Sequence, residues 1–372
     1  MYTPLLNKFK QTHPQWQESL VKNTLLMIAL LVDRQTVCLW KLKGSVGKFL
    51  GNTHTDSRSH YQRIKRWFKQ SLEHKYVWLV LLECAMGLLS KVTKVLILDG
   101  SSWQWGGKTY HFLTLSVLYK GVAVPIYWIE LAKLGISSQN QRKVLLKSVL
   151  KIASLAGKVL VADREYIGSD WFQVLKDNGL DFVIRLREGN YKQAMQAAGI
   201  KLEKLEKKAI KRVGSVFCKP FELGDQSYHL LVTAYKDRNG KTVLLRLITS
   251  LAKPWKAVDF YTLRYRIEPM FKHLKSNGFD LQSLHLQSGR KIRLMMALLV
   301  LAYTLSVVEG LKSYKRKYPP LKHGSPAMSV FRVGIERWQN YLTSFVVFLE
   351  KAFTYFNLVF EKRKHQLNLY VP

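Results

Sequence analysis

The chain has 372 residues, of which 48% are hydrophobic, so its composition is that of a globular and not a disordered protein and allows two or three domains. Lysine and arginine number 59 against 25 aspartates and glutamates, a formal net charge of +34. Because the basic residues are spread along the whole chain, the charge predicts a polyanionic partner. Nucleic acid is the leading expectation, and a ribosome or a membrane surface is the alternative.

Cysteines and apolar runs predict a soluble intracellular protein. Cys38, Cys84 and Cys218 are widely separated and lack a paired metal-ligand spacing, which is typical of reduced thiols. The N-terminus lacks the apolar core of a signal peptide. The apolar runs 77–89 and 294–308 fall short of the roughly 18 residues of a membrane span, so both predict core helices.

Residues 1–90 predict a helical region with few strand signals. Within it, residues 59–72 predict an amphipathic helix that Ser59 could cap. At 100° per residue its apolar and basic residues fall on different faces: Ile64, Phe68 and Leu72 against Arg63, Arg66 and Lys69. Two readings stay open, a DNA-contacting helix of the helix-turn-helix type and a core helix with a solvated basic face.

Strand signals begin near residue 91. KVLILDG (94–100) is a short apolar run that ends in Asp99 and a glycine. The runs 109–119 and 121–131 follow, and the Lys120-Gly121 step between them is typical of a tight hairpin turn.

The next segment alternates helix and strand. A helix is predicted at 138–155, then the strand KVLVADREY (158–166), which contains Asp163, then a helix at 169–178 and a strand at 181–187. Three strands followed by helix, strand, helix and strand predict a mixed α/β sheet.

Residues 190–255 predict a β-rich insertion into this core. A charged helix is expected at 201–212, and the steps Gly224-Asp225 and Asn239-Gly240 are hairpin signals. Helical patterns return near residue 257 and continue to the end, with a basic, proline-containing loop at 313–326.

The segment YTLRYRIEPMFKHLK (261–275) carries one glutamate among cations. On a continuous helix Tyr261, Arg264, Glu268 and Lys275 fall within about 60° of one another. Such a face suits a phosphodiester, because a carboxylate can hold a metal while Arg and Lys bind phosphate oxygens. A set of local salt bridges, Arg264 with Glu268 above all, is the alternative.

Two upstream aspartates favour the first reading. Asp99 and Asp163 each end a predicted buried strand, where functional side chains collect in open α/β sheets. With Glu268 they would hold two Mg²⁺ or Mn²⁺ ions, hard cations that prefer oxygen ligands and that promote phosphodiester displacement in pairs. Three nearby acids are possible alternatives or supporting groups: Glu130, Glu165 and Asp170.

These motifs resemble a known family. LILDGS, VLVADREYIG and the Tyr-x2-Arg-x3-Glu-x6-Lys spacing are similar to bacterial and archaeal insertion-sequence transposases of the Asp-Asp-Glu class, in the subgroup with the Tyr-Arg-Glu-Lys signature. The resemblance runs from about residue 92 to 340. It implies a ribonuclease-H-like α/β core, interrupted by a β-rich insertion and flanked by helical N- and C-terminal regions.

The resemblance also implies roles for the residues. Asp99, Asp163 and Glu268 would bind the divalent metals, while Tyr261, Arg264 and Lys275 would contact DNA phosphates near the cleaved end. The implied reaction is nicking to free a 3′-OH, release of the element and attack of that 3′-OH on target DNA. Synapsis of two ends implies a homodimer on DNA, and the protein would be cytoplasmic and nucleoid-associated.

The implied division of the chain is a DNA-binding helical region (1–90), a core in two parts (91–189 and 256–290), the insertion (190–255) and a helical C-terminal region (291–372). Two other functions stay open at this point, a non-catalytic DNA-binding regulator derived from a transposase and a related nuclease that does not join ends.

Two residues do not follow the family pattern cleanly. Pro269 removes a backbone donor and predicts a kink that puts Lys275 in doubt. Trp255 is the candidate for a tryptophan that stacks on a flipped base in some relatives, but its distance from Glu268 does not decide the match, and a core position is the preferred expectation.

Overall fold

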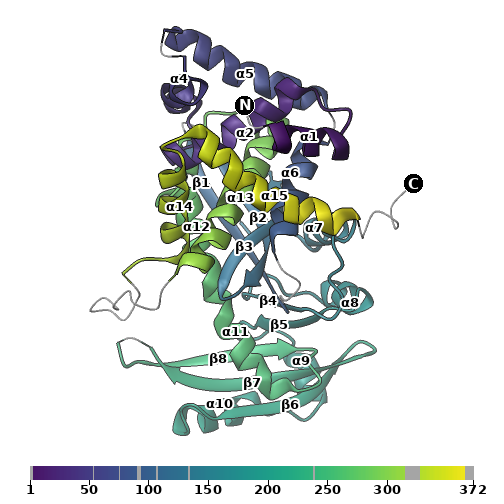
Figure 1. The fold of residues 1–372 in the computed structure, drawn as a ribbon. Coiled ribbons are helices and arrows are strands. Elements are labelled where there is room, and N and C mark those ends of the chain that lie inside the picture. Colours follow the sequence, from purple (N-terminus) through teal and green to yellow (C-terminus); the bar gives the residue numbers. More distant parts are fainter. Residues whose placement is uncertain are drawn as a thin grey trace. The chain divides into compact units, whose positions relative to one another are not determined.

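The computed structural model describes residues 3–364 except 53, 75, 90–93, 106–107, 133–134, 238 and 315–326, so most of the predicted basic loop lies outside the described residues. The chain forms two compact units (Figure 1). The helical unit comprises residues 1–91, 103–108 and 269–372, and the sheet unit comprises residues 92–102 and 109–268. Each unit is described by itself below.

One mixed sheet of eight strands organises the sheet unit, in the order β3-β2-β1-β4-β5-β8-β7-β6. The last residues of β1, from Trp103 on, belong to the helical unit. The strands are β1 (Val95–Trp105), β2 (Lys108–Tyr119), β3 (Val122–Leu131), β4 (Val159–Ala162), β5 (Asp181–Arg185), β6 (Val216–Leu223), β7 (Gln226–Lys236) and β8 (Thr242–Thr249).

The first three strands are consecutive neighbours in the sheet, and β2 pairs antiparallel with β3. Lys120 and Gly121 have φ values of 47° and 84°, so the predicted tight turn is confirmed and adopts the left-handed backbone that such hairpins need. β4 then pairs parallel with β1, and β5 pairs parallel with β4. This mixed sheet with its helices confirms the predicted ribonuclease-H-like α/β class.

The strands of the predicted insertion join the same sheet. β6 and β7 form a hairpin at Gly224, β7 and β8 form another at Gly240, and β8 pairs antiparallel with β5. The helix α10 (Leu202–Lys211) packs on these strands through Leu205 and Ala209, which are buried.

Helices cover the strands that precede the insertion. α7 (Gln139–Leu150) begins with a capping box, in which Ser138 and Gln141 satisfy each other's backbone N–H groups. α8 (Ser169–Asp177) packs on β5, and α11 (Ala257–Thr262) packs against β4, β5 and β8. α9 (Lys192–Ala197) packs instead on β6, a strand of the insertion.

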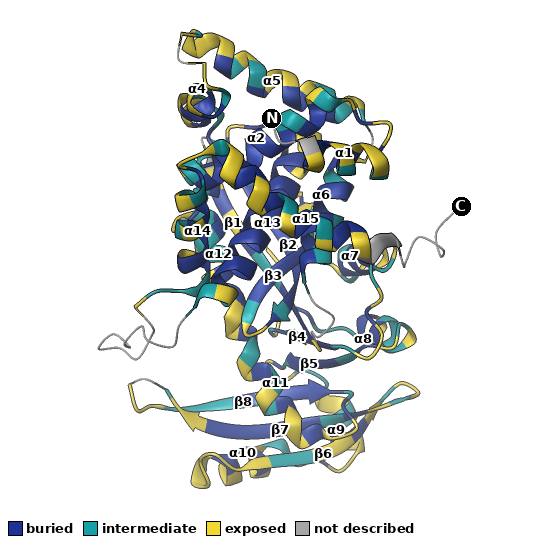
Figure 2. Ribbon diagram, viewed as in Figure 1, coloured by how far each residue is buried: buried dark blue, intermediate teal, exposed yellow. Residues whose placement is uncertain are grey.

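The helical unit has α13 (Gly289–Ser313) at its centre. α13 is long and apolar enough to cross a membrane, but 94% of its most apolar window is buried in the fold, as expected for a core helix (Figure 2). The other helices of the unit, among them the predicted core helix α6, are α1 (Thr3–Thr12), α2 (Glu18–Arg34), α3 (Leu39–Leu42), α4 (Val46–Leu50), α5 (Ser57–Glu73), α6 (Val77–Leu88), α14 (Val330–Tyr341) and α15 (Phe345–Lys364).

α5 is the predicted amphipathic helix, extended by two residues at its start. Ile64 and Phe68 are buried as expected, together with Trp67. The expected cap at Ser59 is wrong, because the helix begins after Asp56 and Ser59 lies inside its first turn.

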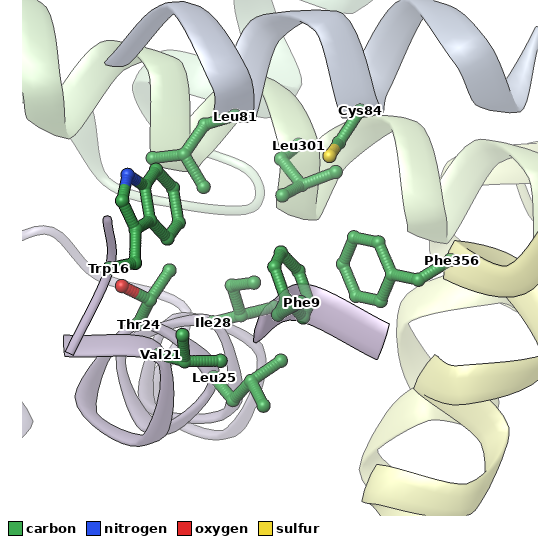
Figure 3. A pocket seen from close by; sticks show the side chains of 10 residues that line it. All are labelled: Phe9, Trp16, Val21, Thr24, Leu25, Ile28, Leu81, Cys84, Leu301 and Phe356. Carbon is green, nitrogen blue, oxygen red and sulfur yellow. The ribbon is translucent and has the colours of Figure 1, made fainter. Parts of the chain in front are cut away.

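A small apolar cavity lies in the core of the helical unit, where Phe9, Trp16 and Phe356 converge with aliphatic side chains of several helices (Figure 3). The rings of Phe9 and Phe356 meet edge to face with centroids 5.5 Å apart. Since its lining carries no charged group, this cavity offers no chemistry and belongs to the packing of the core.

Candidate active site

Strand register brings two aspartates to one edge of the parallel ladder. Leu98 on β1 pairs with Ala162, the last residue of β4, so Asp99 on β1 and Asp163 just after β4 are the next residues along the two parallel strands. Asp99 does not end its strand as the sequence suggested, because β1 continues to Trp105 along β2. It does lie just beyond the part of β1 that pairs with β4, which explains why the two side chains come together.

Asp99 is held by donors on both carboxylate oxygens. Oδ1 accepts from the Gly100 N–H at 2.8 Å and from the Tyr166 hydroxyl at 3.4 Å, and Oδ2 accepts from Arg264 at 3.3 Å. Burial raises the pKa of Asp99 to about 6, although Arg264 and the Gly100 N–H oppose the rise, and the charge of Asp163 adds to it.

Gly100 allows this close approach. A Cβ at this position would lie 3.0 Å from Nε2 of His111 and 3.4 Å from the Tyr166 hydroxyl. A larger residue would therefore press on the side chain that donates to Asp99, which gives the Asp-Gly step of the sequence a reason beyond turn formation.

Asp163 has a phenol and a guanidinium as partners. Its Oδ1 accepts a hydrogen bond from the Tyr261 hydroxyl at 3.2 Å and lies 3.9 Å from Nη1 of Arg185. Strand register places Arg185 beside Asp163, because Ala162 pairs with Ile184 and each of the two residues comes next in its chain segment. Burial, together with the charge of Asp163, raises the pKa of Tyr261 far above its ordinary value, so the phenol is a hydrogen-bond donor at neutral pH.

Arg264 lies between two of the predicted carboxylates. Nη1 is 3.3 Å from Oδ2 of Asp99, and Nη2 is 3.2 Å from Oε1 of Glu268. Its side chain is only 10% exposed, whereas that of Glu268 is 58% exposed. Burial acts to lower the pKa of Arg264, but Tyr261 and the surrounding carboxylates outweigh it, so the pKa lies above its ordinary value. The expected local salt bridge between Arg264 and Glu268 is thus present, and it is part of a larger cluster.

The backbone of this segment is not the continuous α-helix assumed from the sequence. α11 ends at Thr262, the residues Leu263–Arg266 form a 3-10 turn, and α12 spans Ile267–Lys275. The change of helix type comes before Pro269, which lies in the first turn of α12, where a backbone N–H has no partner in the helix. Tyr261 still contacts Asp163 and Arg264 still contacts Asp99, while Glu268 is joined to this group through Arg264.

Lys275 belongs to the other compact unit, because the division of the chain falls between Glu268 and Pro269. It is half-buried, and burial lowers its pKa. Its position relative to the carboxylates therefore stays a prediction from the sequence.

Two further residues of this cluster were missed in the sequence. Tyr166 is four residues from the end of β4 and Arg185 is the last residue of β5, so the DREY motif and the strand end were the available signals. A third missed residue, Arg142 on α7, is 3% exposed and anchors the loop after β4 by donating to the carbonyls of Ile167 (2.9 Å) and Ser137 (2.8 Å). This loop carries both Asp163 and Tyr166.

The other predicted candidates differ in position. Glu165 is exposed but close to the cluster, because its charge adds to burial in raising the pKa of Tyr166. Glu130 is exposed, and Asp170 forms a salt bridge with Lys143 at 3.6 Å. The expected core position of Trp255 is wrong. Trp255 is 60% exposed and lies in the 3-10 turn Pro254–Lys256, just before α11.

Comparison with known proteins identifies the family. Residues 90–305 match the family described as the transposase DDE domain, and this range contains Asp99, Asp163 and Glu268. The chain belongs to the DDE transposase family. No protein with curated annotation matches it. Among solved structures it is similar to the cryo-EM structure of the piggyBac transposase synaptic complex with hairpin DNA, with 10% identity, a TM-score of 0.48, and coverage of 92% of this chain and 72% of that chain.

DDE transposases generally use divalent metals, and the donor set here is suited to them. Asp99, Asp163 and Glu268 offer carboxylate oxygens, and the guanidinium of Arg264 shows that positive charge is stabilised between two of them. Among the residues that the structure describes, no three acidic, histidine or cysteine side chains already form a metal-binding group. The carboxylates of this DDE family member are thus grouped around Arg264.

Proposed function

We propose that this chain is a DNA transposase that cleaves DNA at the ends of its own mobile element and joins the freed 3′-OH to target DNA. The observation that supports the proposal best is the grouping of the three carboxylates with two donors: Tyr261 donates to Asp163, and Arg264 donates to Asp99 and Glu268. These residues come from β1, the loop after β4 and the late helical segment, far apart in the sequence.

In this proposal Asp99, Asp163 and Glu268 are the ligands of two Mg²⁺ or Mn²⁺ ions, which when bound would activate the attacking oxygen and stabilise the leaving one. The ionised carboxylates are needed for this, and burial works against ionisation of Asp99. Asp163 and the exposed Glu268 are the other two proposed ligands.

Arg264 and Tyr261 are proposed to bind DNA phosphate. Arg264 has a planar set of donors suited to phosphate oxygens, and two of these donors form hydrogen bonds with Asp99 and Glu268. Once the carboxylates are neutralised by other cations, the same guanidinium can turn to a phosphate. Tyr261 keeps its proton and can donate to one as well. Lys275 is proposed as a further phosphate contact, and Trp255 as a stacking partner for a flipped base, since its indole is exposed.

At the level of the whole chain, we infer a cut-and-paste insertion-sequence transposase of the Tyr-Arg-Glu-Lys subgroup. Residues 1–90 would bind DNA, residues 91–189 and 256–290 would form the catalytic core around the insertion 190–255, and residues 291–372 would complete it. The protein would act in the cytoplasm on the nucleoid, and two copies would pair two element ends. The net charge of +34 is consistent with DNA as the partner.

Cleavage of DNA that carries the ends flanking the gene, with Mg²⁺ or Mn²⁺, tests the proposal. Wild type should nick at the ends, and Glu268→Gln should bind the same DNA without cutting. Glu336→Gln is the matched control, because Glu336 also pairs with an arginine four residues away, Arg332 at 2.9 Å, but outside the cluster. It should cut like wild type.

The outcomes distinguish the transposase from its two alternatives. Cleavage without joined products would favour a nuclease. If wild type binds the DNA without metal but does not cut it with any metal, a regulator would be favoured. Equal cutting by wild type and Glu268→Gln would show that the carboxylate assignment is wrong.

A further inference from the structure

An exposed group of aromatic and basic side chains lies on the helical unit, at α3 and α5. Trp40 is 60% exposed, although tryptophan is usually buried. Its ring meets that of Tyr61 edge to face with centroids 5.6 Å apart, and Nζ of Lys43 lies 2.9 Å from the centre of the Trp40 ring. Nζ of Lys65 is 5.8 Å from the centre of the Tyr61 ring. We call these four residues the Trp40 platform.

The surface around the Trp40 platform is strongly cationic. α5 contains five lysines and arginines and one acid, Glu73, which is its last residue. Its outward side is exposed along the helix (Figure 2). The exposed cations of α5 are Arg58, Lys65, Arg66 and Lys69. A surface of this charge favours an anionic partner. The exposed aromatic rings favour a partner that also has flat groups able to stack on them.

The buried side of α5 already accounts for its packing. Ile64, Trp67 and Phe68 face the core, and the Trp67 indole N–H donates to Thr24 at 3.0 Å. Trp40, on α3, and the exposed cations of α5 take no part in this packing of α5 on the core. The solvated-face reading explains the lysines and arginines of α5, but it leaves a tryptophan held in solvent by a cation and a second ring without a role.

We propose that the Trp40 platform stacks on an unpaired base of DNA, while Lys43 and Lys65 bind the phosphates beside it. The reason for an unpaired base is geometric. In a duplex the faces of the bases are covered by their neighbours and only their edges are open, so an aromatic ring finds a base face only where a strand is single or its stacking is broken. The inference rests on the proposed function, since DNA cutting and joining supply such nucleotides, and it adds single-strand binding to the helical unit.

The test is the affinity of the full chain for a labelled oligothymidine and for a hairpin duplex, measured by fluorescence anisotropy in EDTA so that no cleavage occurs. Trp40→Leu should weaken oligothymidine binding about tenfold, because the loss of stacking on one base raises the dissociation constant by about that factor. Duplex binding should stay within about twofold of wild type. Trp40→Phe, which keeps a ring, should recover most of the loss. Lys43→Ala should weaken binding and reduce its salt dependence.

Lys351→Ala is the matched control for Lys43→Ala. Lys351 also lies over an aromatic ring, that of Tyr341 at 5.4 Å, in the same unit, and it is more exposed than the half-buried Lys43, so its variant should bind oligothymidine like wild type. Circular dichroism checks that each variant is folded, and Trp40→Phe carries the test if Trp40→Leu is not.

Unchanged oligothymidine affinity in Trp40→Leu would overturn the inference, and so would an equal loss for duplex and single strand. Failure of the proposed function would give a different result, namely no metal-dependent cleavage by wild type. The effect of Trp40 on binding is measured in EDTA, so it does not depend on that outcome.

Discussion

Replacing Asp99 by asparagine should make the metal-free protein more stable while it removes cleavage. The ordinary pKa of this carboxyl is 3.8, and in the fold burial raises it to about 6. A difference of about two pKa units corresponds to about 3 kcal/mol by which the ionised carboxylate destabilises the fold. The Asp99 side chain is 22% exposed, so solvent screens this cost only in part. Asparagine keeps the shape of the group and never ionises.

The sign of the pH dependence follows from the raised pKa. An acid whose pKa is higher in the folded than in the unfolded state destabilises the fold when ionised, and the cost is fully present above about pH 6. It declines as the pH falls and vanishes below about pH 3, where both states carry the proton. Asp99→Asn should therefore gain up to about 3 kcal/mol at pH 8, about half of that at pH 5, and about 0.5 kcal/mol at pH 4.

Urea denaturation in EDTA at these pH values measures the free energy of unfolding. Asp170→Asn is the control, because Asp170 is 67% exposed and outside the cluster, and its variant should stay within about 0.5 kcal/mol of wild type. A destabilised Asp99→Asn at pH 8, or a gain that does not change between pH 8 and pH 4, would refute the reasoning that burial strains this carboxylate.

Three more changes have defined outcomes. Glu309→Gln should lower the free energy of unfolding by about 2 kcal/mol, because the buried Glu309 accepts hydrogen bonds from Tyr355 and three other side chains; no loss in urea denaturation would contradict this. Tyr166→Phe should slow cleavage several-fold with little loss of stability, because it removes a 3.4 Å hydrogen bond to Asp99, and unchanged rates would exclude a positioning role. Lys120→Gly should raise stability by up to about 1 kcal/mol, since φ at this position is 47°, and a loss would show that the lysine side chain matters.

Local signals allowed most of the sheet to be predicted from the sequence. The Lys120-Gly121 step named its turn because the needed backbone conformation depends on those two residues alone. The alternation of helices and strands between residues 138 and 187 likewise predicted α7, β4, α8 and β5. The antiparallel pairing of β8 with β5 depends on contacts between distant segments, so it had no local signal.

The candidate site was predictable in its members more than in its geometry. Asp99, Asp163 and Glu268 stood out as acids at unusual places in a basic chain. The position of Arg264 between Asp99 and Glu268 depends on a 3-10 turn that a helical wheel does not represent. Arg185 came to Asp163 through strand register, which no single segment of the sequence encodes.

The measurement that tests the central claim most directly is metal-specific rescue of cleavage. Asp99→Cys, Asp163→Cys and Glu268→Cys are each assayed on the element's ends with Mg²⁺ and with Mn²⁺. A thiolate is a poor ligand for Mg²⁺ and a better one for Mn²⁺. If these carboxylates bind the metals, the variants should be inactive with Mg²⁺ and recover part of their cleavage with Mn²⁺, while wild type cuts with both. Full cleavage by the variants with Mg²⁺ would contradict the account.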